Sequence, residues 1–253
     1  MANFSVGVQL WPQHTSMADL RQAWQEADAL EVDSLWVWDH FFPLSGDAQG
    51  SNFEAWTMLA AMAADTSHAK LGTMVSSVGY RNPDLLADMA RTVDQISGGR
   101  CYLGIGAGWA ERDYSEYGYS FGTARSRLAD LEAALPRIQA RLERLNPLPA
   151  GRLPILIGGG GEKVTLRLVA TYADAWNGFP PHDAFARKMR VLDDWCEKVG
   201  RDPDEIERTV LLFGEHLDAI DDYVETGATH VIVDVSHPFD LSRVEQTLKQ
   251  ARG

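Results

Sequence analysis

A carboxylate and an imidazole stand side by side among aromatic residues early in the chain. Asp39 and His40 follow Leu35-Trp-Val-Trp38 and precede Phe41-Phe42. An imidazole titrates near neutral pH and can act as a general acid or base. The surrounding rings would shape a pocket for a planar ligand. The pair therefore indicates proton-transfer chemistry, and the alternative is that Asp39 caps a loop while His40 lies on the surface.

A glycine-rich segment, Leu103-Gly-Ile-Gly-Ala-Gly-Trp109, follows a short apolar run. It is not a dinucleotide-binding fingerprint, because Trp109 stands where that motif requires its last glycine. Gly106, Ala107 and Gly108 would instead let a flat ring lie close to the backbone, with Trp109 as a wall. The alternative is a tight turn that only joins a strand to a helix.

A run of four glycines, Gly158–Gly161, leads through Glu162 and Lys163 into a predicted helix. Free N–H groups at a helix N-terminus form an anion site, and Lys163 adds positive charge. The spacing of a Walker loop is absent, because no Gly-Lys-Ser/Thr follows at the required distance. We interpret the segment Gly158–Lys163 as a phosphate site; the alternative is a flexible loop without a ligand.

Other polar and aromatic residues follow further predicted strands, where each could also anchor a loop or face water: Val78–Pro83, Trp176-Asn177, Glu215, Asp234 and His237. The histidines share no metal-binding spacing, and Val8-Gln-Leu-Trp11 lacks the His-x-His of many barrel metallohydrolases. We therefore expect no metal site, and we rank a metal-dependent barrel lyase or hydrolase as a distant third alternative.

Short β-branched or aromatic runs alternate with longer amphipathic runs, which is typical of βα units around a parallel sheet. The eight expected strands start at residues 4, 34, 70, 101, 154, 174, 207 and 230. Helices are expected at Met17–Leu30, Glu54–Ala64, Pro83–Ser97, Arg125–Leu145, Gly161–Tyr172, Asp183–Val199, just before Thr226, and Leu241–Ala251. Eight units predict a (β/α)8 TIM barrel, α/β in class, formed as one domain over residues 1–253. The runner-up is an open doubly wound sheet.

Composition excludes several classes of protein. The 253 residues are 45% hydrophobic and 23% charged, which is ordinary for a folded chain. A net charge of −13 disfavours nucleic acid or an anionic membrane as a partner. Cys101 and Cys196 are the only cysteines, and we interpret both as packing residues in a reducing compartment. No targeting segment or long apolar stretch is present, so we expect a cytoplasmic protein.

These segments together resemble the bacterial luciferase-like superfamily, and in particular its oxidoreductases that depend on coenzyme F420. The resemblance rests on Leu35-Trp-Val-Trp-Asp-His-Phe41, Tyr80-Arg-Asn-Pro-Asp-Leu-Leu-Ala87, Asp94-Gln-Ile-Ser-Gly-Gly-Arg100, Leu103–Trp109, Pro154–Gly161 and Ala173-Asp-Ala-Trp-Asn177. The matching segments span residues 35 to 177. The order of βα units extends the match over the whole chain.

The resemblance implies a luciferase-like barrel that binds a flavin-like ring at its C-terminal mouth. Asp39 would lie beside the deazaflavin, and His40 would transfer protons at the substrate. The Met74-Val75 peptide falls where the family commonly has a non-proline cis bond that bulges against the ring. The backbone of Gly159 and Gly160 would hold the phosphate. The remaining expected cofactor contacts are Gly106, Ala107, Gly108, Gly158, Lys163 and Asn177.

The function expected from this resemblance is hydride transfer between coenzyme F420 and a small, apolar organic substrate. Trp11, Trp38, Phe42 and Trp109 would wall the substrate pocket. Two departures stand out: the chain is shorter than many relatives, and Trp109 replaces the acidic residue of the sugar-phosphate dehydrogenases. The alternatives are a monooxygenase that uses FMN and a flavin- or deazaflavin-binding protein without turnover.

Family likeness also suggests a homodimer formed through helices of the barrel wall. Apolar positions on the second predicted helix are compatible with such an interface: Trp56, Leu59, Met62 and Ala63. The same positions would serve equally to pack that helix on the barrel. Periodicity alone leaves both readings open.

The net charge predicts an unusual salt dependence of cofactor binding. Raising the ionic strength from about 0.01 M to about 0.1 M shortens the Debye length from about 30 Å to about 10 Å. Because the protein carries a net −13, screening should tighten the binding of the polyanionic tail of coenzyme F420. The dissociation constant, measured by fluorescence titration across that range, should fall. A steady weakening would mean that local cations outweigh the net charge.

Overall fold

The strands close into a parallel barrel. The computed structural model describes residues 4–253. Its sheet runs in the order β3-β2-β1-β9-β8-β7-β6-β5-β4, and a pairing between β3 and β5 closes the ring. The strands are β1 (Ser5–Leu10), β2 (Ser34–Val37), β3 (Lys70–Thr73), β4 (Ser76–Ser77), β5 (Cys101–Gly106), β6 (Ile155–Gly158), β7 (Ala175–Gly178), β8 (Glu207–Leu212) and β9 (His230–Val235). The predicted (β/α)8 barrel is confirmed, with β3 and β4 as two parts of one predicted strand, and the open sheet is excluded.

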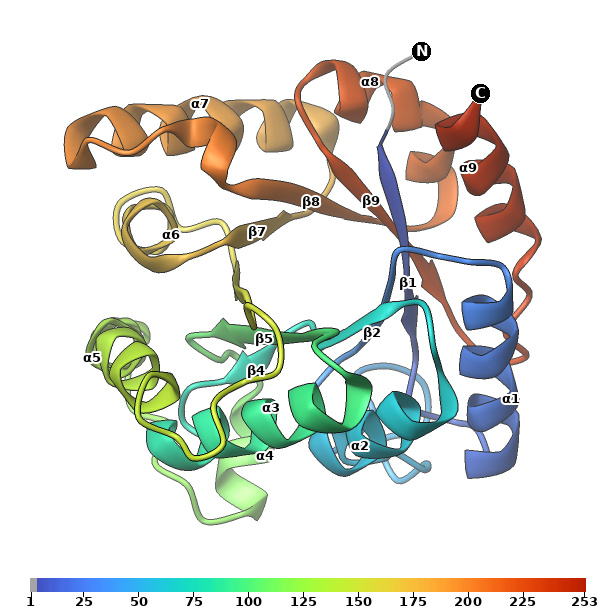
Figure 1. Ribbon diagram of the computed structural model, residues 1–253, viewed down its shortest axis with the longest axis horizontal. Helices are drawn as coiled ribbons and strands as arrows, with labels where there is room; N and C mark the ends of the chain where they lie inside the picture. The colour runs from blue at the N-terminus through green and yellow to red at the C-terminus, as the bar shows by residue number, and fades with distance from the viewer. Residues whose placement is uncertain (1–3) are drawn as a thin grey trace.

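Helices surround the strands on all sides in Figure 1. They are α1 (Met17–Ala29), α2 (Ala55–Asp65), α3 (Pro83–Ser97), α4 (Glu111–Glu116), α5 (Ala124–Leu142), α6 (Thr165–Tyr172), α7 (His182–Val199), α8 (Ile220–Glu225) and α9 (Ser242–Arg252). The expected start of α6 at Gly161 is wrong, because residues 162–164 form a turn before the helix begins at Thr165. Helix α4 was not expected, since six residues are too few to show a helical period. Within residues 4–253, no helix is both long and apolar enough to cross a membrane.

Helix α3 shows how local chemistry sets the element boundaries. The Asn82 side chain accepts a hydrogen bond from the backbone N–H of Asp84, which caps the first turn. Pro83 occupies the first helical position, where a missing N–H costs nothing. The helix ends at Gly98, whose φ of 71° lies in the left-handed region that favours glycine. These signals are local, which is why the sequence predicts both ends correctly.

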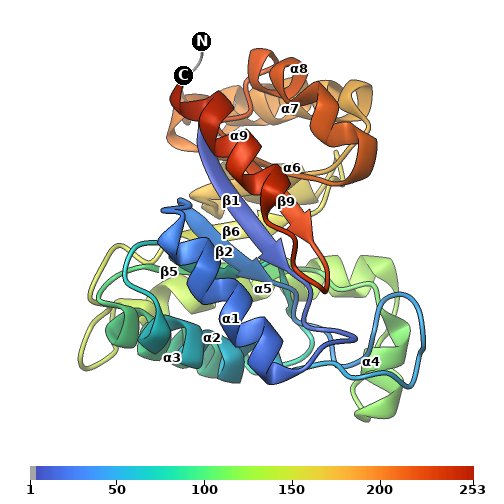
Figure 2. The same ribbon diagram turned by 90° about the vertical axis from the view of Figure 1, so that its right-hand side faces the viewer.

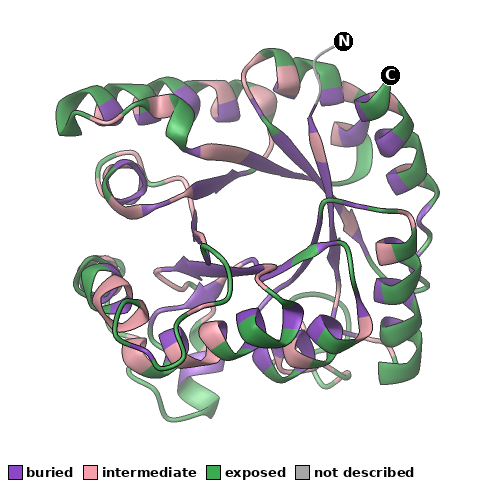
Figure 3. Ribbon diagram, in the orientation of Figure 1, coloured by how far each residue is buried: buried purple, intermediate pink, exposed green. Residues whose placement is uncertain are grey.

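The main core lies between the barrel and its helices. Figure 3 shows buried strands inside a ring of helices whose outer faces are exposed. The apolar positions of α2 could serve either a dimer interface or packing on the barrel. Within this one chain their side chains are 0–3% exposed: Trp56, Leu59, Met62 and Ala63. They therefore pack α2 on the barrel. Both cysteines are buried free thiols, as the packing interpretation expects.

A hydrogen-bonded chain of side chains joins four strands near their N-terminal ends. The Ser34 hydroxyl contacts His230 Nε2 at 2.9 Å, and His230 Nδ1 contacts Glu207 Oε1 at 2.8 Å. The Tyr102 hydroxyl donates to the other oxygen of Glu207 at 2.7 Å. Although burial alone would raise it, the pKa of Glu207 is lowered to about 2, chiefly by its hydrogen bond with His230. This end of the barrel is thus held together by an ionised, fully partnered carboxylate.

Glu207 predicts a defined loss of stability in acid. Its folded pKa lies below the ordinary value of 4.5, so its contribution is fully present above that value. The contribution, at most about 3 kcal/mol, is lost as the pH falls from about 4.5 toward 2. Glu207→Gln should remove this part of the pH dependence of the free energy of unfolding, measured by denaturant titration. The exposed Glu225→Gln should keep it, and equal acid sensitivity of all three proteins would contradict the assignment.

Candidate active site

A cavity of about 270 Å³ opens at the C-terminal mouth of the barrel. Figure 2 shows the segment after β2 and helix α4 on the side to which the arrowheads of β1 and β9 point. None of the side chains that line the cavity is an acid, a lysine or an arginine. The lining residues are His40, Met74, Val75, Ser77, Gly106, Ala107, Gly108, Trp109, Gly158, Gly159, Thr165, Asn177 and Phe179. Ten of these were expected from the sequence.

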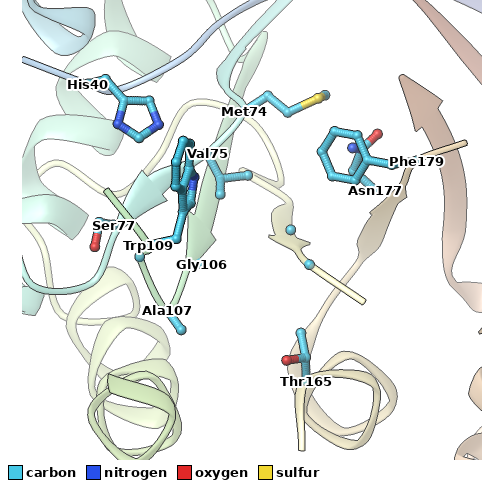
Figure 4. Close-up of a pocket in the computed structure, with 13 residues that line it drawn as sticks. His40, Met74, Val75, Ser77, Gly106, Ala107, Trp109, Thr165, Asn177 and Phe179 are labelled. Carbon is cyan, nitrogen blue, oxygen red and sulfur yellow. The ribbon is translucent and has the colours of Figure 1, made fainter. Parts of the chain in front are cut away.

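The floor of the cavity is formed where β3 gives way to β4. The Met74-Val75 peptide is cis, as the resemblance predicts. The Val75 side chain lies against the backbone of two neighbouring strands: a Cβ built on Gly106 or Gly158 would come within 2.9–3.0 Å of its methyl groups. Figure 4 shows Val75 in the middle of the lining residues. Glycine at both positions therefore lets the floor lie flat.

His40 is held from behind by a buried carboxylate. Its Nδ1 lies 2.6 Å from Asp113 Oδ2, and the Asp113 side chain is 2% exposed. The same carboxylate accepts the Tyr80 hydroxyl at 2.5 Å and the backbone N–H of Phe41 at 3.2 Å. Although burial opposes it, the hydrogen bonds from His40 and Tyr80 lower the pKa of Asp113. The ring of Trp109 meets the imidazole edge-on at a centroid distance of 5.4 Å.

Asp39 does not reach the cavity, in contrast to the expectation that it lies beside the cofactor ring. It is fully buried and accepts hydrogen bonds from Ser76 Oγ at 2.6 Å and from Arg81. Arg81 also bonds Glu54 Oε1 at 2.6 Å, and Glu54 caps the start of α2. Burial raises the pKa of the Asp39 carboxyl, against the opposing effect of Arg81. A buried carboxylate needs a charged partner, and Arg81 supplies it for Asp39.

Three of the four expected aromatic walls also lie outside the cavity lining. Trp11 donates its indole N–H to Asp234 at 2.6 Å and packs against Trp38 at a centroid distance of 5.2 Å. Phe42 is covered by the guanidinium of Arg112 at 4.0 Å from the ring centroid. Only Trp109 lines the cavity as expected. Phe179, which the sequence reasoning missed, lies across from it (Figure 4).

The glycine run meets the cavity at one end and a lysine at the other. Gly158 and Gly159 line the cavity, while Gly160 lies beyond its edge. Lys163 is exposed and does not line the cavity either. A Cβ built on Gly160 would collide with the ammonium of Lys188, which reaches the loop from α7. Lys188, rather than Lys163, is therefore the cation beside the glycine backbone.

Thr165 and Asn177 present polar groups to the cavity. Thr165, the first residue of α6, is 6% exposed, and its hydroxyl makes no hydrogen bond within residues 4–253. Asn177 accepts the Thr209 hydroxyl on Oδ1 at 2.7 Å. Its buried Nδ2 has no partner among the described residues. This side of the cavity thus holds one donor that lacks an acceptor and one free hydroxyl.

Several residues that shape the site gave weak or no signal in the sequence. In the sequence, Tyr80 and Arg81 could equally serve to anchor a loop. Asp113 belongs to the short helix α4, which has no detectable period, and Lys188 is one of several charges on the face of a long helix. Ser77 and Thr165 look like ordinary residues beside a strand or helix. In the described part of the chain, no group of three or more His, Cys, Asp or Glu side chains could hold a metal ion.

Comparison with known proteins places this geometry in a family. The phthiodiolone/phenolphthiodiolone dimycocerosates ketoreductase of Mycobacterium tuberculosis is 29% identical over 250 residues, which cover 81% of this chain and 64% of the relative. The solved structure of an F420-dependent secondary alcohol dehydrogenase in complex with an F420-acetone adduct matches with a TM-score of 0.86 at 16% identity, covering 100% of both chains.

A third comparison is with a flavin enzyme. The oxygenating constituent of 3,6-diketocamphane monooxygenase from Pseudomonas putida, solved in complex with FMN, matches with a TM-score of 0.64 at 18% identity. The match covers 83% of this chain and 66% of that one. At such identities the structural likeness shows the fold alone. A sequence profile of the luciferase-like monooxygenase family matches residues 3–222, and the chain therefore belongs to that family.

Proposed function

We propose that this protein is an oxidoreductase that binds coenzyme F420 at the barrel mouth and transfers a hydride between it and an uncharged, apolar organic substrate. The observation that carries the proposal is the cavity itself. It has a flat floor of glycine backbone and Val75, a histidine at one edge, and no charged side chain in its lining. A planar, largely apolar ring fits such a floor, and a proton-transfer group stands beside it.

The residues present fit a flavin-like ring. Because Gly106 and Gly158 have no Cβ, the Val75 side chain lies directly against their backbone, and together they form the cavity floor. The unpartnered Nδ2 of Asn177 supplies a donor for a ring carbonyl. When bound, a deazaflavin accepts or supplies a hydride at a ring carbon, and the protein contributes orientation and proton management. Asp39, which does not reach the cavity, would act indirectly by fixing the backbone that leads into His40.

The phosphate of the cofactor would bind at the start of α6. The backbone N–H groups around Gly159 and Gly160, the Thr165 hydroxyl and the Lys188 ammonium surround one corner of the cavity. Together they combine a helix N-terminus, a neutral donor and a cation. This assigns to Lys188 the charge that the sequence pattern assigns to Lys163.

His40 is the proposed acid or base. Its Nδ1 is occupied by Asp113, while its Nε2 has no partner within residues 4–253 and the ring lines the cavity. Trp109 is 66% exposed and Phe179 is 41% exposed, although both are large and apolar. They flank the opening from opposite sides (Figure 4). This pairing supports an uncharged apolar substrate that covers both rings, held with its reacting oxygen near His40.

The extent of the structural matches favours coenzyme F420 over FMN. The structural match to an F420-dependent dehydrogenase covers the whole of both chains, whereas the FMN-containing monooxygenase exceeds this chain in length. An FMN-dependent monooxygenase remains the second candidate, because the same cavity floor suits either ring. A homodimer and a cytoplasmic location stay predictions.

Titration with each cofactor tests the proposal. The purified protein should bind coenzyme F420 at micromolar concentration or below, equivalent to about −8 kcal/mol or better. FMN should bind at least about tenfold more weakly, a difference of about 1.4 kcal/mol. Fluorescence quenching of each ligand provides the measurement. If coenzyme F420 does not bind below about 1 mM, the proposal is wrong. If the purified protein shows the absorption spectrum of bound FMN, the monooxygenase is favoured.

Substitution of two lysines tests the phosphate site. Lys188→Ala should weaken the binding of coenzyme F420 about tenfold, because a charge-assisted hydrogen bond is lost. It should leave the affinity for the phosphate-free deazaflavin riboside unchanged. Lys163→Ala removes the same charge from an exposed position and should change neither affinity. If Lys163→Ala weakens the binding of coenzyme F420 more than Lys188→Ala does in isothermal titration, Lys163 is the phosphate-binding cation, as the sequence pattern predicts.

A further inference from the structure

The candidate acid or base is part of a buried network of side chains that lie far apart in the sequence. Asp113 Oδ2 lies 2.6 Å from His40 Nδ1 and 2.5 Å from the Tyr80 hydroxyl. Its other oxygen accepts the backbone N–H of Phe41, the residue next to His40. The carboxylate thus holds both the ring and the main chain of the same segment, while Asn52 Nδ2 donates to the His40 carbonyl at 2.6 Å.

The charge state of Asp113 decides how it can bond His40. Tyr80 donates a hydroxyl and Phe41 donates an N–H, so the carboxylate acts as an acceptor toward both. No lysine or arginine forms an ion pair with Asp113 in the described part of the chain. An ionised carboxylate can only accept, so the imidazole must present a protonated Nδ1 to it. The proton of neutral His40 is therefore on Nδ1, and the lone pair is on Nε2.

Because Nε2 faces the cavity, this tautomer allows neutral His40 to act as a base toward a ligand there. His40 lines the cavity, and its Nε2 bonds to no group within residues 4–253. Trp109 covers one edge of the ring, which restricts other orientations. A lone pair on Nε2 can accept the proton of a substrate hydroxyl, and a protonated Nε2 can return it to a substrate carbonyl. With the opposite tautomer, neutral His40 would carry its proton on the cavity side and could not act as a base.

We propose that Asp113, with Tyr80 as its second donor, is a positioning residue that fixes His40 in the Nδ1-protonated tautomer and directs the free Nε2 into the cavity. The role of that Nε2 in turnover rests on the proposed function. The tautomer itself does not, because it is a property of the protein alone. The carboxylate also stabilises the imidazolium that forms when Nε2 takes up a proton, as in other acid-base pairs that share this arrangement.

The tautomer can be measured without any ligand. In protein labelled with 15N-histidine, two-bond proton–nitrogen correlations at about pH 8, where a free imidazole is neutral, distinguish a bare ring nitrogen from a protonated one. The His40 signals are those that disappear in His40→Gln. Wild-type His40 should show a protonated Nδ1 and a bare Nε2. A dominant Nε2-protonated form in the wild type would overturn the proposal.

Three variants separate control of the tautomer from general disruption of the site. Asp113→Asn should lose the dominance of the Nδ1-protonated form, because an amide can donate as well as accept. Tyr80→Phe keeps the carboxylate and should keep the wild-type tautomer. Glu111→Gln removes an equal charge from an exposed position of the same helix and should change nothing. A folded Asp113→Asn protein with unchanged His40 signals would also overturn the proposal.

Kinetics then test the link to function, with coenzyme F420 and cyclohexanol as the probes. Asp113→Asn should lower kcat about 10- to 100-fold, as expected for the loss of a supporting carboxylate, with KM changed less than about twofold. The pH profile of kcat should move to lower pH, because the charge that stabilises the imidazolium is gone. Wild-type kcat with wild-type pH dependence in this variant would refute the positioning role. If the probes do not react with the wild type, the proposed function fails while the tautomer result still stands.

Discussion

The burial of one carboxylate organises the mouth of this barrel. Asp39 has no solvent exposure, and a buried ionised group is tolerated only with a charged partner and further hydrogen bonds. Arg81 and Ser76 supply them, and Arg81 also binds Glu54 at the start of α2. A single charge thus joins the end of β2, the short strand β4, the loop before α3 and the cap of α2. These are the segments that carry His40 and the floor of the cavity.

The consequence is a division between a charged support and an uncharged site. The charged side chains lie behind the lining, where Arg81 partners Asp39 and Asp113 supports the lining residue His40. The lining itself holds glycine backbone, apolar side chains and a few neutral polar groups. In such a setting an unpaired donor or acceptor is costly, which makes the free groups of Asn177, Thr165 and His40 informative about the ligand. They suit a flat ring and a substrate oxygen.

The overall acidity of the protein does not conflict with a phosphate site. A net charge of −13 creates a repulsive field, but that field is screened over about 10 Å at ordinary ionic strength. In the proposed phosphate site, Lys188 and the N-terminus of α6 would bind the ligand through direct hydrogen bonds, over distances at which screening is small. Local geometry can therefore oppose the global field. Lys163, although it stands two residues after the glycine run in the sequence, is exposed and does not line the cavity.

Local patterns were sufficient for the fold and for most of the cavity lining. Alternating periodicity located all eight strands, because each strand carries its own apolar pattern, and glycine positions such as Gly106 and Gly158 marked the close approach at the mouth. The boundaries of α3 followed from Asn82, Pro83 and Gly98, which act within one helical turn. Helix α6 was expected too early, since a glycine run can begin a helix or form a turn.

What the sequence by itself determined was the closed barrel, the histidine at its mouth and the glycine backbone of its floor. Only the tertiary structure decided which charges meet. Asp113 is 73 residues from His40, Arg81 is 42 residues from Asp39, and both pairs form because the strand ends converge at one rim. Ion pairs and hydrogen bonds of this range depend on distances in space, and no local period encodes them. For that reason the sequence identified the histidine at the mouth but not the residues that orient it.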